Sequence, residues 1–159
     1  MATVTVKRSD SARVVVPPPL IYLIGLIIGY GLGLVVPVVI SPSVLFLILG
    51  VVLIFGGLSI AFSAIRTFRS HRTTTNTTMP ATTLVQDGPF RFTRNPMYLS
   101  LAIVYLGLAL IMDSLWALVL VVPVVTVVNY YVIAREERYL ERAFGDDYRM
   151  YRAKVRRWI

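Results

Sequence analysis

Long uninterrupted apolar blocks, separated by short polar segments, dominate the pattern of this chain. The blocks cover residues 20–36, 44–65, 97–112 and 115–133. Soluble helices and strands carry apolar residues at regular intervals on one face, whereas these blocks are apolar all round. A helix needs about 20 apolar residues to cross ~30 Å of hydrocarbon. We therefore expect an all-α membrane protein with four transmembrane helices, forming a single domain over residues 1–159.

Proline and glycine mark the ends and the faces of these helices. An N-terminal arm, residues 1–19, ends in three consecutive prolines. Pro96 suits the first turn of the third helix, where a missing N–H costs no hydrogen bond. Gly25, Gly29 and Gly33 recur every four residues and therefore share one face, on which a neighbouring helix can approach closely. That face predicts helix packing and also allows a homodimer.

The charges predict the topology. The chain has 57% hydrophobic and 15% charged residues, with a formal net charge of +8. All 16 lysines and arginines lie in the N-terminal arm, in residues 66–94 or in the tail from Arg135 onward. Basic residues concentrate on the cytoplasmic side of membrane proteins. Both termini and the middle loop are therefore expected to be cytoplasmic, and the positive charge is expected to face membrane lipids, with no role in nucleic-acid binding.

The choice of reactive residues narrows the possible chemistry. The chain has no cysteine, and its one histidine is His71. Disulfides, thiolate nucleophiles and metal sites built from Cys or His clusters are therefore excluded, and no metal is expected. Any reaction must rely on carboxylates, arginines, tyrosines, backbone groups or a bound cofactor.

Two polar regions flank the last two apolar blocks. The first, residues 84–98, is rich in Arg, Asn, Gly and Pro, and the threonine-rich residues 73–83 before it are either a linker or a segment that orders around a ligand. The second, residues 134–159, predicts an amphipathic helical tail in which Gly145 ends a first helix. Aromatic and apolar residues then recur at helical spacing, at Tyr148, Tyr151, Val155 and Trp158. Arg149, Arg152 and Trp158 fit anchors at the membrane interface.

Several short motifs in these regions resemble one family. They are Leu84-Val85, Gly88-Pro89-Phe90, Arg94-Asn95-Pro96-Met97-Tyr98, Glu136-Glu137 and Phe144-Gly145-Asp146-Asp147-Tyr148. In this order and spacing, they resemble the integral-membrane methyltransferases, a group that covers the isoprenylcysteine carboxyl methyltransferases and the phospholipid N-methyltransferases. The similarity covers about half of the chain, from residue 73 to the C-terminus. Asn-Pro-Met-Tyr is closer to the phospholipid enzymes, because many carboxyl methyltransferases have His in place of Asn95.

The resemblance implies transfer of a methyl group from S-adenosyl-L-methionine to a hydrophobic or lipid-linked acceptor at the cytoplasmic membrane face. Isoprenylcysteine carboxyl methylation is the first expectation, phospholipid N-methylation the alternative. The implied cofactor residues are Thr82, Thr83, Leu84, Val85, Phe90, Asn95, Pro96, Met97, Tyr98, Glu136 and Tyr148. The residues expected to serve the reaction are Arg94, Tyr98, Arg135 and Glu137, with Arg135 contacting the acceptor.

The chemistry of the cofactor agrees with these residue types. S-adenosylmethionine carries an ammonium, a carboxylate and a sulfonium. Glu136 or Glu137 suits the ammonium, Arg94 suits the carboxylate, and tyrosine faces suit the cationic end. The methyl group is already activated, so alignment of the reactants is the main task of the protein. Two other readings stay open: a lipid- or nucleotide-binding membrane protein without transferase activity, and a structural membrane protein.

Overall fold

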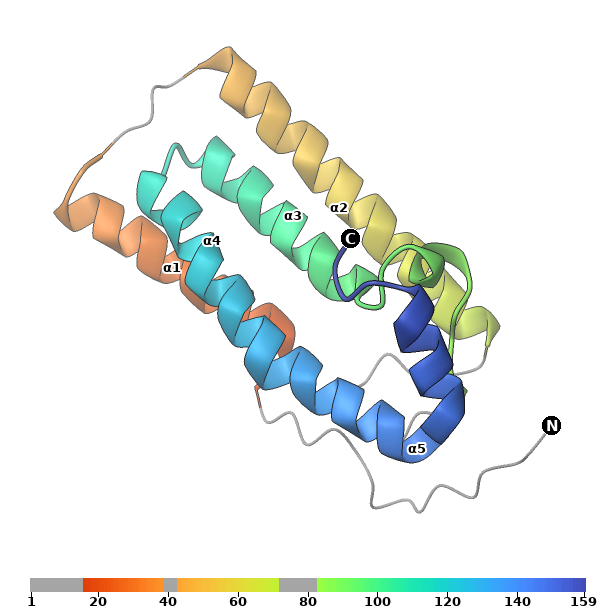
Figure 1. The fold of residues 1–159 in the computed structure, drawn as a ribbon. Helices are drawn as coiled ribbons and strands as arrows, with labels where there is room; N and C mark the ends of the chain where they lie inside the picture. Colours follow the sequence, from red (N-terminus) through yellow and green to blue (C-terminus); the bar gives the residue numbers. More distant parts are fainter. Residues whose placement is uncertain (1–15, 39–42, 72–82) are drawn as a thin grey trace. The chain divides into compact units, whose positions relative to one another are not determined.

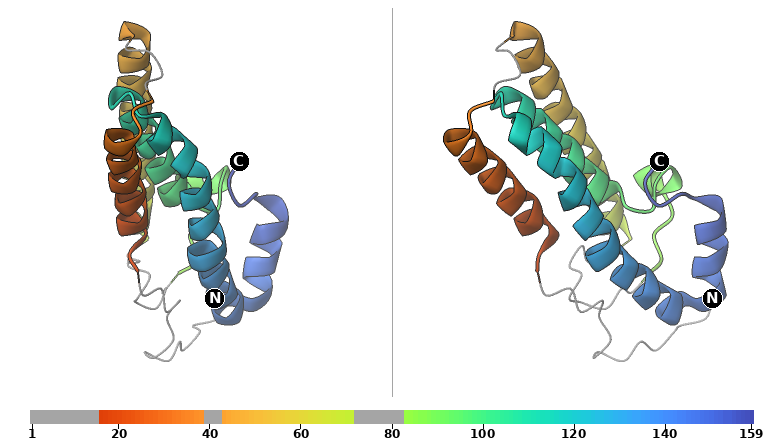
Figure 2. Two further views of the ribbon diagram at one scale, coloured as in Figure 1. Left: turned by 90° about the vertical axis from the view of Figure 1, so that its left-hand side faces the viewer. Right: turned by 60° about the vertical axis from the view of Figure 1, so that its left-hand side comes forward.

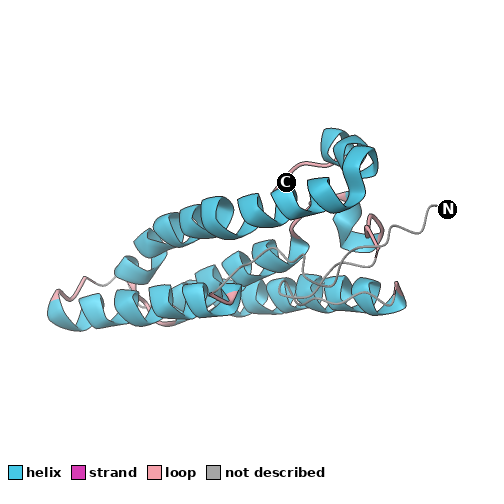
Figure 3. Cartoon of the chain, turned by 90° about the horizontal axis from the view of Figure 1, so that it is seen from below, coloured by secondary structure: helices cyan, strands magenta, loops and turns pink. Residues whose placement is uncertain are grey.

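The computed structural model describes residues 16–38, 43–71 and 83–159, and every regular element in these ranges is helical (Figure 3). The elements are α1 (Pro18–Val35), α2 (Val44–Ser70), the short 3-10 helix η1 (Gly88–Arg91), α3 (Pro96–Ile111), α4 (Leu115–Val127), the π-helical turn η2 (Val128–Ile133) and α5 (Ala134–Lys154) (Figure 1). The predicted all-helical fold is confirmed.

Three helical segments of the described chain are long and apolar enough to cross a membrane. They are Pro18–Val35, Val44–Ser70 and the continuous segment Leu115–Lys154, whose apolar part is residues 115–133. The predicted third span forms the apolar helix Pro96–Ile111, which has 16 residues. At 1.5 Å per residue this helix is about 24 Å long, less than the ~30 Å of hydrocarbon. The membrane character is therefore confirmed, and three of the four predicted spans have the length that crossing requires.

The described chain divides into two compact units. The apolar unit consists of residues 16–61 and 97–128, and the polar unit contains residues 62–96 and 129–159. In the apolar unit α1 lies beside α4, and α2 lies beside α3 (Figures 1 and 2). Large apolar side chains along α1 and α2 are exposed, which suits contact with lipid.

Glycines allow these helix pairs to approach closely. A Cβ atom on Gly29 would lie 2.6 Å from the Ala117 Cα, and one on Gly25 would collide with the Val124 side chain. Similarly, a Cβ atom on Gly50 would lie 2.7 Å from the carbonyl oxygen of Gly107. The prediction that the glycine face of the first helix packs against a neighbour is confirmed for Gly25 and Gly29. Since that neighbour is α4 of the same chain, a homodimer would need a different surface.

Local sequence explains where the helices of the apolar unit begin. Pro18 occupies the first turn of α1, where no backbone N–H is needed. The Ser114 side chain caps α4 by accepting a hydrogen bond from the Ala117 N–H at 3.2 Å. The Tyr22 hydroxyl of α1 donates to the Tyr98 carbonyl at 3.1 Å, which joins α1 to the first turn of α3.

In the polar unit, the end of α2 holds the segment that precedes α3. Gly88 has a φ of 57°, and a Cβ atom there would lie 2.6 Å from the Thr67 Oγ1. Both the backbone conformation and the close approach therefore require glycine. The ring of Phe90 packs on that of Phe68, with centroids 4.9 Å apart. These contacts fix η1 on α2.

The tail differs in part from the prediction. Gly145, with φ 53° and ψ −122°, interrupts the helical backbone of α5 as expected, and the ribbon bends there (Figures 1 and 2). Helix then resumes only as far as Lys154, and Val155 is extended. The predicted helical spacing therefore holds for Tyr148 and Tyr151 and is wrong for Val155 and Trp158. The reason lies in tertiary contacts that redirect residues 155–159.

Candidate active site

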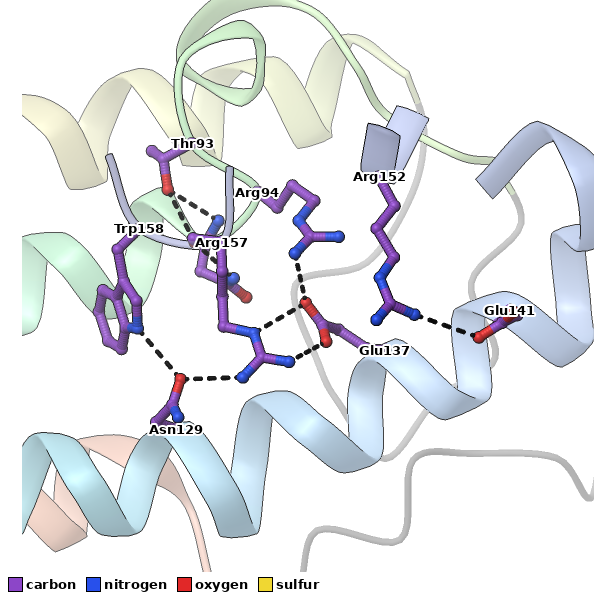
Figure 4. Close-up of polar contacts among 9 residues, drawn as sticks. Thr93, Arg94, Asn129, Glu137, Glu141, Arg152, Arg157 and Trp158 are labelled. Atoms are coloured by element: carbon purple, nitrogen blue, oxygen red, sulfur yellow. Dashed lines mark hydrogen bonds and ion pairs between the residues drawn. The ribbon is translucent and has the colours of Figure 1, made fainter. Parts of the chain in front are cut away.

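A cluster of buried charges lies where the segment before α3 meets the start of α5 within the polar unit. The Arg94 Nη2 lies 3.0 Å from the Glu137 Oε1, and the two side chains are only 9% and 8% exposed. The Arg157 Nε donates to the same oxygen at 3.1 Å, and its Nη2 donates to the Glu137 Oε2 (Figure 4). Glu137 thus binds two guanidinium groups, and both of its oxygens are engaged.

The π-helical turn η2 contributes an amide to this cluster. The Asn129 Oδ1 accepts hydrogen bonds from the Arg157 Nη1 and from the Trp158 Nε1, both at 3.1 Å (Figure 4). π-Helical turns are rare and often occur at functional sites. Trp158 therefore uses its indole N–H inside the protein, and its role as an anchor at the membrane interface stays a prediction.

The C-terminal residues bind the segment before α3 through their backbone. The Asn95 Nδ2 donates to the Arg157 carbonyl at 2.8 Å, and the Thr93 Oγ1 donates to the same carbonyl at 3.2 Å. The Arg94 N–H donates to the Arg156 carbonyl at 3.0 Å. Thr93 and Asn95 are both buried. The predicted meeting of this segment with the acidic start of the tail is therefore present, with Arg157 between them.

Three buried polar atoms near this cluster have no hydrogen-bond partner among the described residues. They are the Nε and Nη1 of Arg94 and the hydroxyl of Tyr148. A buried donor without a partner costs about 1–3 kcal/mol, so such atoms are uncommon and call for an explanation. The Arg94, Glu137 and Arg157 side chains together carry one formal positive charge, since two guanidinium groups face one carboxylate. The group therefore suits an anionic ligand that accepts hydrogen bonds.

Burial and charge set the protonation of the neighbouring residues. Burial raises the pKa of the Tyr148 phenol to about 12, and the Glu137 carboxylate adds to this rise. The hydrogen bond to Glu137 raises the pKa of the Arg157 guanidinium, whereas burial opposes that rise. Tyr148 is therefore a neutral hydrogen-bond donor at neutral pH. Tyr151, whose ring centroid lies 6.3 Å from that of Tyr148, donates its hydroxyl to the Phe90 carbonyl at 2.8 Å.

Several of the predicted site residues belong to this polar unit. Val85, Phe90, Asn95, Pro96, Glu137 and Tyr148 are buried in it. Leu84 and Glu136 are half-buried and Thr83 is exposed, while Thr82 lies outside the described residues. Glu137 is held between the guanidinium groups of Arg94 and Arg157. The guanidinium carbon of Arg135 lies 4.1 Å from the centroid of the Tyr131 ring, in a cation–π contact.

Met97 and Tyr98 belong to the apolar unit. The Met97 carbonyl accepts a hydrogen bond from the Ser100 hydroxyl at 2.7 Å, and Tyr98 is buried. Their proposed part in cofactor binding stays a prediction. Among the described residues, no three His, Cys, Asp or Glu side chains gather in a way that would hold a metal ion.

Sequence reasoning missed Thr93, Asn129 and Arg157 as members of the cluster. Asn129 had a usable signal, because it is the only carboxamide in the apolar block 115–133 and polar residues inside spans are often functional. Arg157 had none, since it is one of several arginines in a basic tail. Its partners are set by the path of the chain after Lys154.

Comparison with known proteins decides the family. The sequence profile of the phospholipid methyltransferase family matches residues 45–147, more than half of the chain. The chain belongs to the phospholipid methyltransferase family. This membership confirms the resemblance to membrane methyltransferases that the motifs indicated. An uncharacterized protein of Haemophilus influenzae is 48% identical over 63 residues, which cover 40% of this chain and 100% of that protein. No solved structure matches the chain.

Proposed function

We propose that this family member transfers a methyl group from S-adenosyl-L-methionine to a hydrophobic or lipid-linked acceptor at the cytoplasmic membrane face. The observation that carries the proposal is the buried Arg94, whose Nε and Nη1 have no partner among the described residues. These two nitrogens lie on different edges of the guanidinium group, so each can donate a charge-assisted hydrogen bond to an anionic ligand such as a carboxylate. The cofactor carries such a carboxylate, and the family match supports methyl transfer.

The residues of the polar unit fit the rest of the cofactor as well. The Tyr148 hydroxyl is a second buried donor, and the aromatic rings of Tyr148 and Phe90 offer apolar faces. Glu136, on the first turn of α5, is the acid we assign to the ammonium, as the family motifs imply. When bound, the cofactor supplies a methyl group on a sulfonium, which is already activated for transfer.

The partners of Glu137 bear on which methyl acceptor the protein uses. A carboxylate acceptor needs no base, whereas an ammonium acceptor must first lose a proton. Both oxygens of Glu137 are already engaged by the guanidinium groups of Arg94 and Arg157, which suits a structural role better than that of a base. We therefore propose that Glu137 positions the two arginines, and that a carboxylate such as that of an isoprenylcysteine is the first candidate acceptor. Phospholipid amines are the second candidate, favoured by the family to which the chain belongs.

Binding and turnover test the proposal separately. Calorimetry of the detergent-solubilised protein with S-adenosylhomocysteine should show binding, and Arg94→Gln should weaken it at least ~tenfold, because a charge-assisted pair is lost. The fold should survive this change, since Glu137 keeps its neutral pair with Arg157. Arg91→Gln is the matched control, because Arg91 lies three residues earlier and is exposed. Equal affinities of the two variants would refute the assignment of Arg94.

Turnover identifies the acceptor. The protein is incubated with cofactor labelled in the methyl group, in vesicles that contain either a farnesylated cysteine or phosphatidylethanolamine. Label in a base-labile ester supports carboxyl methylation, and label in the lipid headgroup supports amine methylation. If neither acceptor is labelled although the cofactor binds, a lipid- or nucleotide-binding protein without transferase activity becomes the better interpretation.

A further inference from the structure

The last five residues of the chain, Val155–Ile159, return to the candidate active site after α5 ends. Val155 is extended, and the carbonyls of Arg156 and Arg157 accept the hydrogen bonds of Thr93, Arg94 and Asn95. The segment therefore closes the polar unit by pairing with the residues just before α3 (Figure 4). The family profile ends at residue 147, so this segment lies beyond the matched part of the chain, whereas its partners lie within it.

The Arg157 side chain makes the most specific of these contacts. Its Nε and Nη2 bind the two oxygens of Glu137, and its Nη1 binds Asn129. The side chain is 29% exposed, whereas that of Glu137 is 8% exposed. Arg157 therefore lies at the outer edge of a pair whose acidic member is buried. A planar guanidinium can engage both oxygens of a carboxylate at once, which an ammonium cannot do.

The two hydrogen bonds from Arg157 to Glu137 determine which donors of Arg94 stay available. Because Arg157 engages both oxygens of Glu137, Arg94 reaches the carboxylate with Nη2 alone. The Nε and Nη1 of Arg94 stay without partners among the described residues. Without Arg157, Glu137 would be free to bind Arg94 through two parallel hydrogen bonds, the arrangement that this ion pair favours. Such a pair would use Nη2 together with Nε or Nη1, so Arg94 would keep only one of these two donors for a carboxylate ligand.

We propose that Arg157 is a positioning residue for the cofactor site, which keeps two donors of Arg94 available by occupying Glu137 itself. This inference rests on the proposed function. Arg157 acts through Glu137 and Arg94 and need not touch the cofactor. It is specific for the amino-acid end of the cofactor, because that end carries the carboxylate that Arg94 would bind.

The test compares two ligands that differ at that end. S-adenosylhomocysteine carries the amino-acid group, and methylthioadenosine has the same nucleoside without it. Calorimetry with solubilised Arg157→Gln should show S-adenosylhomocysteine affinity reduced at least ~tenfold, by loss of charge-assisted hydrogen bonds, and unchanged methylthioadenosine affinity. Lys154→Gln removes one positive charge from an exposed site three residues earlier and should leave both affinities unchanged.

The outcomes separate this inference from the proposed function. Equal weakening of both ligands by Arg157→Gln would indicate a general structural role and overturn the inference. Unchanged binding of both would overturn it while leaving the proposed function intact, since the unaltered protein would still bind the cofactor analogue. If the unaltered protein bound neither ligand, the proposed function would fall, and the inference with it. Arg157→Lys should bind S-adenosylhomocysteine more tightly than Arg157→Gln but less tightly than the unaltered protein. Lysine returns the positive charge, but its ammonium group cannot engage both oxygens of Glu137 as a guanidinium group does.

Discussion

Replacement of Glu137 by Gln should destabilise the fold strongly. The carboxylate binds Arg94 at 3.0 Å and Arg157 at 3.1 Å, with a further hydrogen bond from the Arg157 Nη2. A neutral amide at this position would leave two guanidinium groups close together without a countercharge. Loss of one partner of a buried ion pair costs about 3–5 kcal/mol. For a protein of this size, that cost corresponds to a fall in the unfolding midpoint on the order of 10 °C.

Glu141→Gln provides a matched control on the same helix. Glu141 also pairs with two arginines, Arg149 at 3.2 Å and Arg152 at 3.5 Å, but these side chains are 63% and 50% exposed. Exposed pairs contribute about 0–1 kcal/mol, because water competes for both charges. Thermal unfolding in detergent, followed by circular dichroism, measures both variants. Equal shifts of the two midpoints would refute the reasoning, because burial would then make no difference.

Two further predictions use pairs of similar residues. Tyr148→Phe removes a hydroxyl without a partner among the described residues, so the unfolding midpoint should stay unchanged or rise while calorimetry shows weaker binding of S-adenosylhomocysteine. Tyr151→Phe loses the hydrogen bond to the Phe90 carbonyl and should lower the free energy of unfolding by about 1 kcal/mol. A larger loss of stability for Tyr148→Phe than for Tyr151→Phe would contradict the role given to the Tyr148 hydroxyl. Gly29→Ala should cost about 1–3 kcal/mol or more in thermal unfolding, because its Cβ would lie 2.6 Å from the Ala117 Cα. Gly31→Ala meets nothing within 4 Å and should cost nothing; equal effects at the two sites would count against close packing of α1 on α4.

Much of the fold could be predicted from local sequence. The short-range signals are the apolar blocks, the prolines at helix starts and Gly145 in the tail. The bounds of the helices in the described residues agree closely with these signals. The motifs also identified the family correctly. The end of the tail helix at Lys154 was not predictable in the same way. It depends on contacts with residues far away in the chain.

The sequence by itself determined that this protein is a helical membrane protein of a methyltransferase family, and it indicated arginines and acids near α3 and α5 as candidate site residues. Only the tertiary structure decided that Glu137 meets Arg94, and that Arg157 and Asn129 join them. Adjacent residues on a helix point about 100° apart, and the π-helical turn before α5 shifts that phase. The partner of Arg157 is fixed by the return of residues 155–159. Periodicity in the sequence carries no information about such long-range pairing, because Asn95 and Arg157, which meet, are 62 residues apart.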